Sequence, residues 1–533
     1  MAFPKKSVFI LFVFNILLLN NDIYSQEVPQ SVNNKGIYDF LDELANIQII
    51  SINSAIKPYS RLFIFQKLKE AREKQADLNN RQQKELDFYL LDFGKEVEGL
   101  TTHDARRKDL FYYKDDLFSL TVNPILGGEV FSNASGKATY WRNGAEARGY
   151  IQKWGFYASL RDNHENPLLG KPAYLTQREG GHIKGSTDWS EMQGGVTYSW
   201  KWGSAGLVKD RVQWGNNYNG ANIFGGNNPT FVQLKLHIAP VKWFDFNYFH
   251  GWLNSMVVDS TNSYWVSNSY GRDYREVYHK KFIAANMLTI TPFKNLNISA
   301  GNSIIYDNQN ANPAYLIPLF FYKSVDHSLT SGIDNMNSQM FFDISSRQIK
   351  KLHLYVTMFI DELSVSRFTM KDEWNFFSYK AGFRLTDFPV LNLSFTTEFT
   401  YTYPLTFQHY VPTLTFENAG FNLGHYMKDN SKEWYLAFDY HPLRALSINL
   451  FFIDAIHGPD YTALGVDRLG NPPLSSIEWH NTSYGIKASY QVINDLYTWF
   501  SFCNSNIRGR QDWSPGYFYG VKSTVNAGVS FGF

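Results

Sequence analysis

One pattern constrains this chain more than any other. Apolar and polar residues alternate, and the alternation returns many times after residue 117. Between residues 391 and 402, the odd positions are Leu, Leu, Phe, Thr, Phe and Tyr, whereas the even positions are Asn, Ser, Thr and Glu. Successive side chains of a β-strand point to opposite faces, so this period of two predicts strands with one apolar face. Residues 525–533 alternate in the same way and end on the aromatic Phe533.

An outer-membrane β-barrel is the fold class that this series predicts. Alternating segments of about ten residues, with an aromatic residue closing the last strand, are typical of such barrels. The chain has 34 Tyr, 43 Phe and 14 Trp, yet no stretch after the N-terminus has the ~20 apolar residues of a spanning helix. A barrel explains both facts, because each strand has one lipid-facing side and aromatic girdles lie at both interfaces. A soluble propeller or sandwich is the alternative, but it would not give so many strands of this length.

The alternation predicts an all-β membrane protein with an 18-stranded antiparallel barrel. Bacterial single-chain barrels have even strand numbers. The predicted strands are 117–124, 144–151, 154–162, 191–200, 203–213, 230–238, 243–252, 277–288, 295–305, 337–346, 351–361, 376–386, 391–402, 433–441, 445–454, 482–491, 494–503 and 524–533. The connections then run long, short, long, short, and barrels have short periplasmic turns and longer outer loops. This predicts the bacterial outer membrane, a periplasmic N-terminus and extracellular long loops.

The N-terminal part has a different character. Residues 1–25 predict a secretory signal peptide, with two lysines before a short apolar core and a small residue at a plausible cleavage point. Residues 26–108 predict a helical region that plugs the barrel or lies in the periplasm, and residues 109–533 predict the barrel itself. Helical spacing of apolar residues, with Ser60 as one helix cap, predicts three helices. Their predicted ranges are roughly 35–47, 60–76 and 80–96.

Composition also excludes two kinds of protein. Cys503 is the only cysteine, so an intrachain disulfide is excluded. The formal net charge of +1 argues against a nucleic-acid partner, which calls for a clustered basic surface. The expected partners of the barrel are outer-membrane lipid and, through the N-terminal helices, other envelope proteins.

Four segments, in this order, carry a resemblance to a known family. They are Arg211-Val212-Gln213-Trp214-Gly215, Asp361-Glu362, Glu398-Phe399-Thr400-Tyr401 and Asn422-Leu423-Gly424-His425. Their order and spacing resemble the capsule assembly Wzi family of outer-membrane proteins, from about residue 110 to the end. Two positions depart from the family pattern: Phe399 replaces the usual Tyr, and Asn216-Asn217 replaces the Pro-Gly that commonly follows Trp-Gly.

The resemblance implies an 18-stranded barrel with an N-terminal helical plug. It also implies a surface role in retaining capsular polysaccharide. The helical N-terminal region is not part of the match, and members with such extensions can serve other envelope assemblies. A shared fold supports a structural expectation more firmly than a functional one.

Glycan binding needs flat aromatic faces for sugar rings and planar polar groups for hydroxyls. The predicted outer loops are rich in both, although many of these aromatics can equally form the interfacial girdle or loop cores. The candidate glycan-binding residues are Trp141, Trp189, Trp214, Asn216, Tyr218, Trp265, Tyr410, His425, Trp479 and Trp513.

Cations on the lumen side have two possible roles. The alternation places Lys235, Lys380, Arg384 and Lys487 inward, where they could attract an acidic polysaccharide. We expect instead that they form ion pairs with lumen carboxylates such as Glu398, because an unpaired charge in a plugged lumen is costly.

Catalysis finds no support in the motifs. The chain has no phosphate-binding loop and no HExxH or CxxC pattern. Asp454, His457 and Asp460 lie close together, but their spacing matches no metal site, and ordinary loop polarity explains them. We predict no enzyme activity, no cofactor and no metal.

The sequence favours one function and leaves two alternatives open. The favoured function is that of a barrel that binds capsular or extracellular polysaccharide through its outer loops and helps to anchor or assemble it. The first alternative is a non-catalytic subunit of an envelope machine for secretion or outer-membrane protein assembly, docked through its N-terminal helices. The second alternative is a passive porin.

Overall fold

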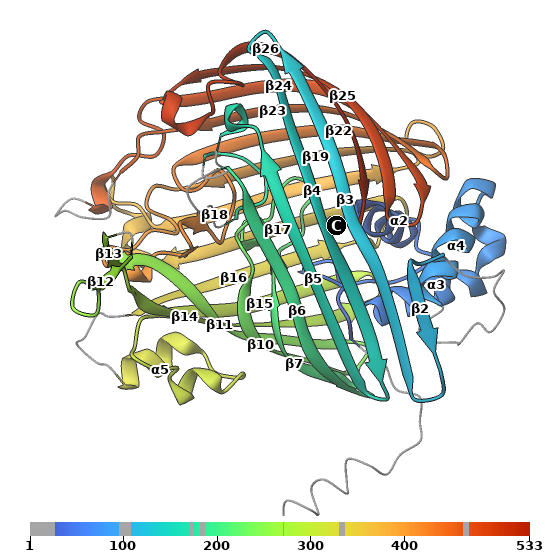
Figure 1. Ribbon diagram of the computed structural model, residues 1–533, viewed down its shortest axis with the longest axis horizontal. Coiled ribbons are helices and arrows are strands. Elements are labelled where there is room, and N and C mark those ends of the chain that lie inside the picture. Colours follow the sequence, from blue (N-terminus) through green and yellow to red (C-terminus); the bar gives the residue numbers. More distant parts are fainter. Residues whose placement is uncertain are drawn as a thin grey trace, which may run out of the picture.

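The computed structural model describes residues 27–94, 108–170, 174–181, 187–269, 271–329, 336–461 and 468–532. The predicted signal peptide, residues 1–25, lies outside them. Eighteen antiparallel strands close into a barrel, as predicted (Figure 1). These are β3 (Phe118–Asn133), β4 (Gly136–Ile151), β5 (Trp154–Glu165), β6 (Trp189–Trp200), β7 (Gly203–Asp210), β10 (Phe231–Val241), β11 (Phe244–Val258), β14 (Tyr278–Phe293), β15 (Leu296–Tyr306), β16 (Met336–Ser346), β17 (Leu352–Glu362), β18 (Phe376–Thr386), β19 (Leu393–Thr402), β22 (Ser431–Leu443), β23 (Leu446–His457), β24 (Trp479–Ile493), β25 (Leu496–Gly509) and β26 (Gly520–Phe531).

The barrel closes between its first and last strands. β26 pairs with β3, for example Phe531 with Leu126. A short extra strand, β2 (Phe111–Lys114), pairs with the other half of β3. Each of the 18 predicted strands overlaps one of the barrel strands, which confirms the strand assignment.

One predicted connection is wrong. The sequence predicted a long connection over 125–143, but β3 and β4 continue through it and meet at a two-residue turn, Ala134-Ser135. Glycines and polar residues interrupt the apolar face there, as in Gly127-Gly128 and Arg142-Asn143-Gly144. Backbone hydrogen bonds between β3 and β4 hold the hairpin, and they do not require alternating apolar and polar side chains. The sequence pattern therefore did not predict this part of the two strands.

The barrel has a turn end and a loop end. Most connections at the turn end are two-residue turns, such as Gln152-Lys153 and Asn494-Asp495, and the long connections other than the one just corrected gather at the opposite, loop end. The loop-end connections contain short elements of their own, among them the hairpin of β12 (Tyr264–Asn268) and β13 (Gly271–Arg275) and the helix α5 (Tyr322–Leu329).

The barrel is polar inside and apolar outside. On β19 the buried residues are the polar ones, including Thr396, Glu398 and Thr400, while Phe395 and Phe399 lie on the other face. A soluble sandwich buries its apolar face, so this reversed burial is the signature of strands whose outer face meets lipid. Outward side chains such as Phe500 on β25 and Val356 on β17 are exposed accordingly.

Three helices close the turn end of the barrel, near the predicted positions. They are α2 (Lys35–Asn46), α3 (Arg61–Glu73) and α4 (Asn80–Phe93). Ser60 caps α3 by accepting a hydrogen bond from the Phe63 N–H at 3.1 Å, as predicted. Figure 1 shows α2 in the mouth of the barrel, with α3 and α4 beside it. Among the described residues, no helix is long and apolar enough to cross a membrane.

Hydrogen bonds fasten these helices to the barrel rim. The Lys351 N–H donates to the Asn46 carbonyl at 2.6 Å, and the Arg81 guanidinium donates to Asn392 Oδ1 at 3.0 Å. From α2 the chain then enters the lumen, where β1 (Ile56–Lys57) pairs with β8 (Gln213–Trp214), a short strand in the connection between β7 and β10. The two predicted alternatives for this region therefore resolve into a plug that is seated at the mouth and extends inside.

Candidate functional site

The connection between β7 and β10, residues 211–230, folds into the lumen; we call it the inward loop. Its strands β8 (Gln213–Trp214) and β9 (Phe224–Gly225) form a small sheet with β1 of the plug. Trp214 lies at its centre, with its ring 5.3 Å from that of Phe224 and 5.2 Å from that of Phe249 on the barrel wall. Gly215 follows with a φ of +99°, a conformation that favours glycine, and its N–H donates to the Ala55 carbonyl at 2.7 Å.

Glu398 on β19 holds the tip of the inward loop. Its two oxygens accept hydrogen bonds from the Tyr218 N–H at 2.6 Å and the Asn219 N–H at 2.8 Å. Lys380 on β18 lies 3.1 Å from the same carboxylate, and both side chains are almost completely buried. A buried carboxylate with one cationic partner and two backbone donors is well satisfied, so it fixes the loop in one conformation.

A second carboxylate repeats this arrangement. Asp343 on β16 accepts from the Asn216 backbone N–H at 2.9 Å and from the Asn216 amide at 2.6 Å. The Ser54 hydroxyl of the plug donates to Asn216 Oδ1 at 2.5 Å. Plug, inward loop and barrel wall therefore share a single network at Asn216.

The base of the inward loop is fixed by ion pairs. Arg211 lies 2.6 Å from Glu179, which also pairs with Arg161 on β5. Burial acts to raise the pKa of Glu179, but these two guanidinium groups together hold it below its ordinary value. Glu179 is therefore ionised, and it links Arg161 on the barrel strand β5 to Arg211 at the base of the inward loop.

Tyr218 connects the inward loop to helix α2. Its hydroxyl lies 2.8 Å from His353 Nδ1 and also donates to Asp42 on α2. Arg347, on a turn at the barrel rim, approaches Asp42 to 2.5 Å. Burial raises the pKa of Asp42, but Arg347 and neighbouring positive charges lower it below its ordinary value, so Asp42 is ionised.

The connection 403–430, between β19 and β22, packs on the inward loop and contains two further family-motif residues. Gly424 lies against the ring of Phe407, where a Cβ would be only 2.4 Å from the ring. Asp361 on β17 accepts from the Phe407 N–H at 2.7 Å. Burial and Lys380 hold the pKa of His425 well below its ordinary value, so its 3.7 Å approach to Glu433 is a contact of a neutral ring.

The predicted pairing of lumen cations is confirmed for three of the four. Lys380 pairs with Glu398, Arg384 lies 3.1 Å from Asp439, and Lys235 lies 3.7 Å from Asp210. Lys487 instead lies over the ring of Trp499, 5.5 Å from its centre. These cations serve the internal network and do not form a free basic lining.

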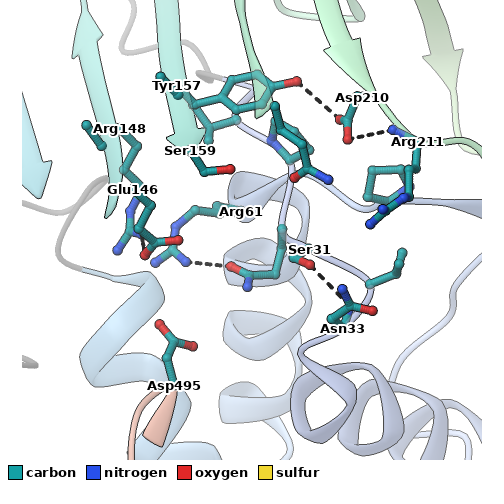
Figure 2. A pocket seen from close by; sticks show the side chains of 18 of the residues that line it. Ser31, Asn33, Arg61, Glu146, Arg148, Tyr157, Ser159, Asp210, Arg211 and Asp495 are labelled. Atoms are coloured by element: carbon teal, nitrogen blue, oxygen red, sulfur yellow. Dashed lines mark hydrogen bonds and ion pairs between the residues drawn. The ribbon is translucent and has the colours of Figure 1, made fainter. Parts of the chain in front are cut away.

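A polar cavity of about 80 Å³ remains between the plug and strands β4–β7 (Figure 2). Tyr157 donates to Asp210 at 3.1 Å on one side, and Arg61 donates to Gln30 at 2.6 Å on the other. Pockets for small organic ligands typically measure at least about 300 Å³, whereas each water needs about 10–15 Å³. The cavity fits a few waters and is too small for a sugar ring.

The structure divides the ten candidate glycan-binding residues into two groups. Six are buried or mostly buried and serve the packing of the lumen or of the loops: Trp189, Trp214, Asn216, Tyr218, His425 and Trp479. The expectation that they lie exposed in outer loops is corrected. Trp214, Asn216, Tyr218 and His425 lie on connections that fold into the lumen, and Trp189 and Trp479 are buried at the first positions of β6 and β24. Trp141 is exposed, but on the outward face of β4, where it stacks on His164 at 3.8 Å.

Trp265, Tyr410 and Trp513 keep accessible surface at the loop end. Trp265, on the β12–β13 hairpin, is 59 % exposed. The ring of Tyr274 lies 5.2 Å from that of Trp265, and the guanidinium of Arg272 lies 5.3 Å from it. We call Trp265, Arg272 and Tyr274 the aromatic platform. Tyr274 is not among the ten candidates from the sequence, and its pairing with Trp265 across the hairpin appears only in the structure.

The remaining motif residue and the metal candidates have local partners. Glu362 accepts from Arg367 at 2.5 Å near the loop end. Asp454 pairs with His480 at 2.7 Å, away from the buried His457. No group of three or more His, Cys, Asp or Glu residues able to hold a metal occurs in the part of the chain that the structure describes.

Comparison with known proteins gives the fold a name. No family model and no curated protein matches the sequence. The solved structure of Wzi from Escherichia coli, an outer-membrane protein involved in group 1 capsule assembly and a carbohydrate-binding β-barrel, matches with a TM-score of 0.59 and 11 % identity. The match covers 96 % of this chain and all of that one.

The fold is that of Wzi. The predicted resemblance, which began at about residue 110, is thereby confirmed for the barrel. The structural match also extends over the N-terminal region, which the sequence resemblance did not include. Two other outer-membrane barrels match less well. OprD of Pseudomonas aeruginosa matches with a TM-score of 0.42 and 10 % identity, over 77 % of this chain and 94 % of that one. OccAB3 of Acinetobacter baumannii matches with a TM-score of 0.43 and 9 % identity, over 78 % of this chain and 99 % of that one.

Proposed function

We propose that this protein is a plugged outer-membrane barrel that binds surface polysaccharide at its loop end and helps to anchor or assemble it. Residues 109–533 form the barrel, residues 26–108 form the plug, and a signal peptide over 1–25 directs export. The plug lies on the periplasmic side, and the aromatic platform faces the outside. The protein acts as a binding element without catalysis.

The observation that carries this proposal is the aromatic platform above a filled lumen. Trp265 and Tyr274 present two exposed rings beside the donor groups of Arg272, on a hairpin at the loop end. Sugar rings stack on aromatic faces, and a guanidinium donates to hydroxyls or carboxylates. The full-length match to a carbohydrate-binding barrel adds support from fold alone.

Binding of purified polysaccharide to the reconstituted barrel tests the proposal. The polysaccharide comes from the cells that make the protein, and binding is measured by biolayer interferometry on lipid nanodiscs. We expect Trp265→Ala to weaken binding at least about tenfold, which equals about 1.4 kcal/mol. In cells, the same variant should move polysaccharide from the cell-bound to the released fraction.

Trp243→Ala is the matched control. Trp243 is 57 % exposed, nearly as much as Trp265, but it lies in a turn at the opposite end of the barrel. If both variants bind like the wild type, the platform is not the binding surface. If the wild type itself binds no polysaccharide, the proposed function falls.

The filled lumen makes a passive porin the weaker proposal. The inward loop, β1 and the connection 403–430 occupy the interior and are held there by buried carboxylates. Planar-bilayer recordings of the wild type should therefore show no stable open conductance. Docking to an envelope machine through residues 26–108 stays a prediction, which co-purification after mild detergent extraction can test.

A further inference from the structure

The outward face of the barrel wall carries polar residues at the level where lipid is expected. On β14, Met287 points into the lumen cluster around Trp214, so its neighbours Asn286 and Leu288 point outward. Leu288 is exposed, as a lipid-facing residue should be, but Asn286 is almost completely buried. Asn302 on β15 is its outward neighbour, and Asn302 Nδ2 donates to Asn286 Oδ1 at 2.7 Å. Something outside the wall therefore covers this pair.

The cover is residues 312–329, the connection from β15 toward β16, which we call the lateral flap. It comprises a short 3-10 turn, Pro313–Leu316, and α5. Figure 1 shows α5 outside the barrel, and α5 packs against β15 and β16. The rings of Tyr315 and Tyr322 are buried against outward residues of the wall, including Tyr248, Phe282 and Ile304.

Hydrogen bonds from the outward wall hold the irregular backbone of the lateral flap. The Asn286 amide donates to the Pro318 carbonyl at 2.8 Å and to the Phe320 carbonyl at 3.0 Å. The Tyr322 N–H donates to Asn302 Oδ1 at 2.9 Å. The Tyr248 hydroxyl also donates to the Tyr315 carbonyl at 2.9 Å.

These hydrogen bonds contribute most to stability where water is scarce. In water, the carbonyls of a surface loop need no protein donor. In the hydrocarbon layer, an unsatisfied backbone group costs several kcal/mol, and irregular backbone is tolerated only where protein groups satisfy it. Asn286 lies near the middle of β14, a strand of 16 residues, whereas about 9–11 residues suffice to span a membrane. The lateral flap therefore reaches the depth of the bilayer.

The first part of the lateral flap exposes an apolar surface, which consists of Leu316, Ile317, Leu319, Phe320 and Phe321. The helix α5 that follows exposes Leu329 and also the polar residues Ser324, His327 and Ser328. Leu319 is 74 % exposed. The apolar surface continues the outward row of Leu288 and Ile290 on β14 and of Phe342 and Ile344 on β16, which the barrel fold exposes to lipid.

We infer that residues 316–321 of the lateral flap are embedded in the membrane, where their exposed apolar side chains bind lipid acyl chains and the outward asparagines of β14 and β15 hold the backbone of the flap. Lipid is favoured over a protein partner because the apolar surface is continuous with the lipid-facing wall. The inference requires only that the barrel is in a bilayer, and it does not depend on polysaccharide binding.

Spin labelling in lipid vesicles tests the inference. Cys503 is the only cysteine, so Leu319→Cys in a Cys503→Ser background gives a single site for a nitroxide. Collision rates with oxygen, which concentrates in lipid, and with a water-soluble nickel chelate report the surroundings of the label. Ile344→Cys on the lipid-facing wall and Arg272→Cys on the aromatic platform provide the lipid and water references.

We expect the label at position 319 to match the lipid reference, with oxygen collisions dominating. Asn286→Leu keeps a lipid-compatible wall but removes the donor, so it should release the flap and shift the label toward the water reference. A label at 319 that collides with nickel as freely as the label at 272 would overturn membrane embedding. Spin–spin broadening would show that the labels of two protein copies lie close together at position 319, and it would overturn lipid as the occupant. Unchanged collision rates of the label in Asn286→Leu would overturn the role of the asparagine.

Discussion

Removal of the charge on Glu398 should release the tip of the inward loop. In Glu398→Gln, one of the two oxygens that accept from Tyr218 and Asn219 is replaced by an amide donor, and Lys380 loses its anionic partner. Lys380 is completely buried, so no water is available to replace that partner. Breaking a buried ion pair from one side costs about 3–5 kcal/mol.

That cost acts first on the loop, because the lost contacts hold only its tip. Each 1.4 kcal/mol is a factor of ten, so the open state should gain roughly 100- to 4,000-fold in population. Hydrogen–deuterium exchange is the direct assay, since the Tyr218 and Asn219 amide protons are themselves the donors to Glu398. We expect peptides that cover 216–220 to exchange faster by this factor, up to the limit set by global unfolding.

The double variant Glu398→Gln with Lys380→Met separates the charge effect from the lost hydrogen bond. Removing both charges leaves no unpaired ion, so exchange should be slower than in Glu398→Gln alone. Glu362→Gln is the control, because Glu362 pairs with Arg367 at a partly exposed site, where a pair contributes at most about 1 kcal/mol. Exchange in Glu398→Gln within about threefold of the wild type, or faster exchange in the double variant, would refute the reasoning.

Three further predictions follow from the plug and the inward loop. Gly215→Ala should lower stability by about 1–2 kcal/mol, because φ is +99° there, whereas Gly128→Ala, which meets no atom within 4 Å, should change thermal unfolding little. Arg347→Met should leave Asp42 without its cationic partner, which costs about 3–5 kcal/mol. Tryptic cleavage of the plug should then be roughly 100-fold faster or more. An unchanged cleavage rate would count against the ion pair between Arg347 and Asp42. Burial raises the pKa of Glu85 to about 8, so the folded plug binds a proton there at pH values where the unfolded chain, with a pKa near 4.5, has released it. The free energy of unfolding, measured in guanidinium, should therefore fall as the pH rises from 5 to 9. Glu85→Gln should flatten the upper part of that fall.

The alternation and the helical spacing predicted most of the scaffold. All 18 barrel strands and the three plug helices lie where these local patterns placed them, because each pattern depends on residues only two to four positions apart. The exception is the second half of β3 and the first half of β4, which form a hairpin rich in glycines and polar residues. These residues do not alternate between apolar and polar, so the pattern did not predict them as strands. A backbone ladder can form there without an apolar face.

The candidate site was predicted in its chemistry but not in its placement. Pairing of Lys380 with Glu398 followed from the cost of an unpaired charge in a closed lumen. That Tyr218 and Asn216 are buried did not follow, since an Asn- and Gly-rich connection reads as an exposed loop. Its carboxylate partners come from β16 and β19, far along the chain, so no local window of sequence contains the interaction.

The barrel, its strand order and the reversed polarity of its wall therefore follow from local patterns in the sequence. The direction of the long connections depends on contacts that form only in the folded protein. The inward loop turns into the lumen because wall carboxylates satisfy its backbone N–H groups, and the lateral flap folds onto the outer wall because two asparagines satisfy its backbone. Both segments are irregular, and the direction of an irregular segment is set by whichever distant side chains complete its hydrogen bonds.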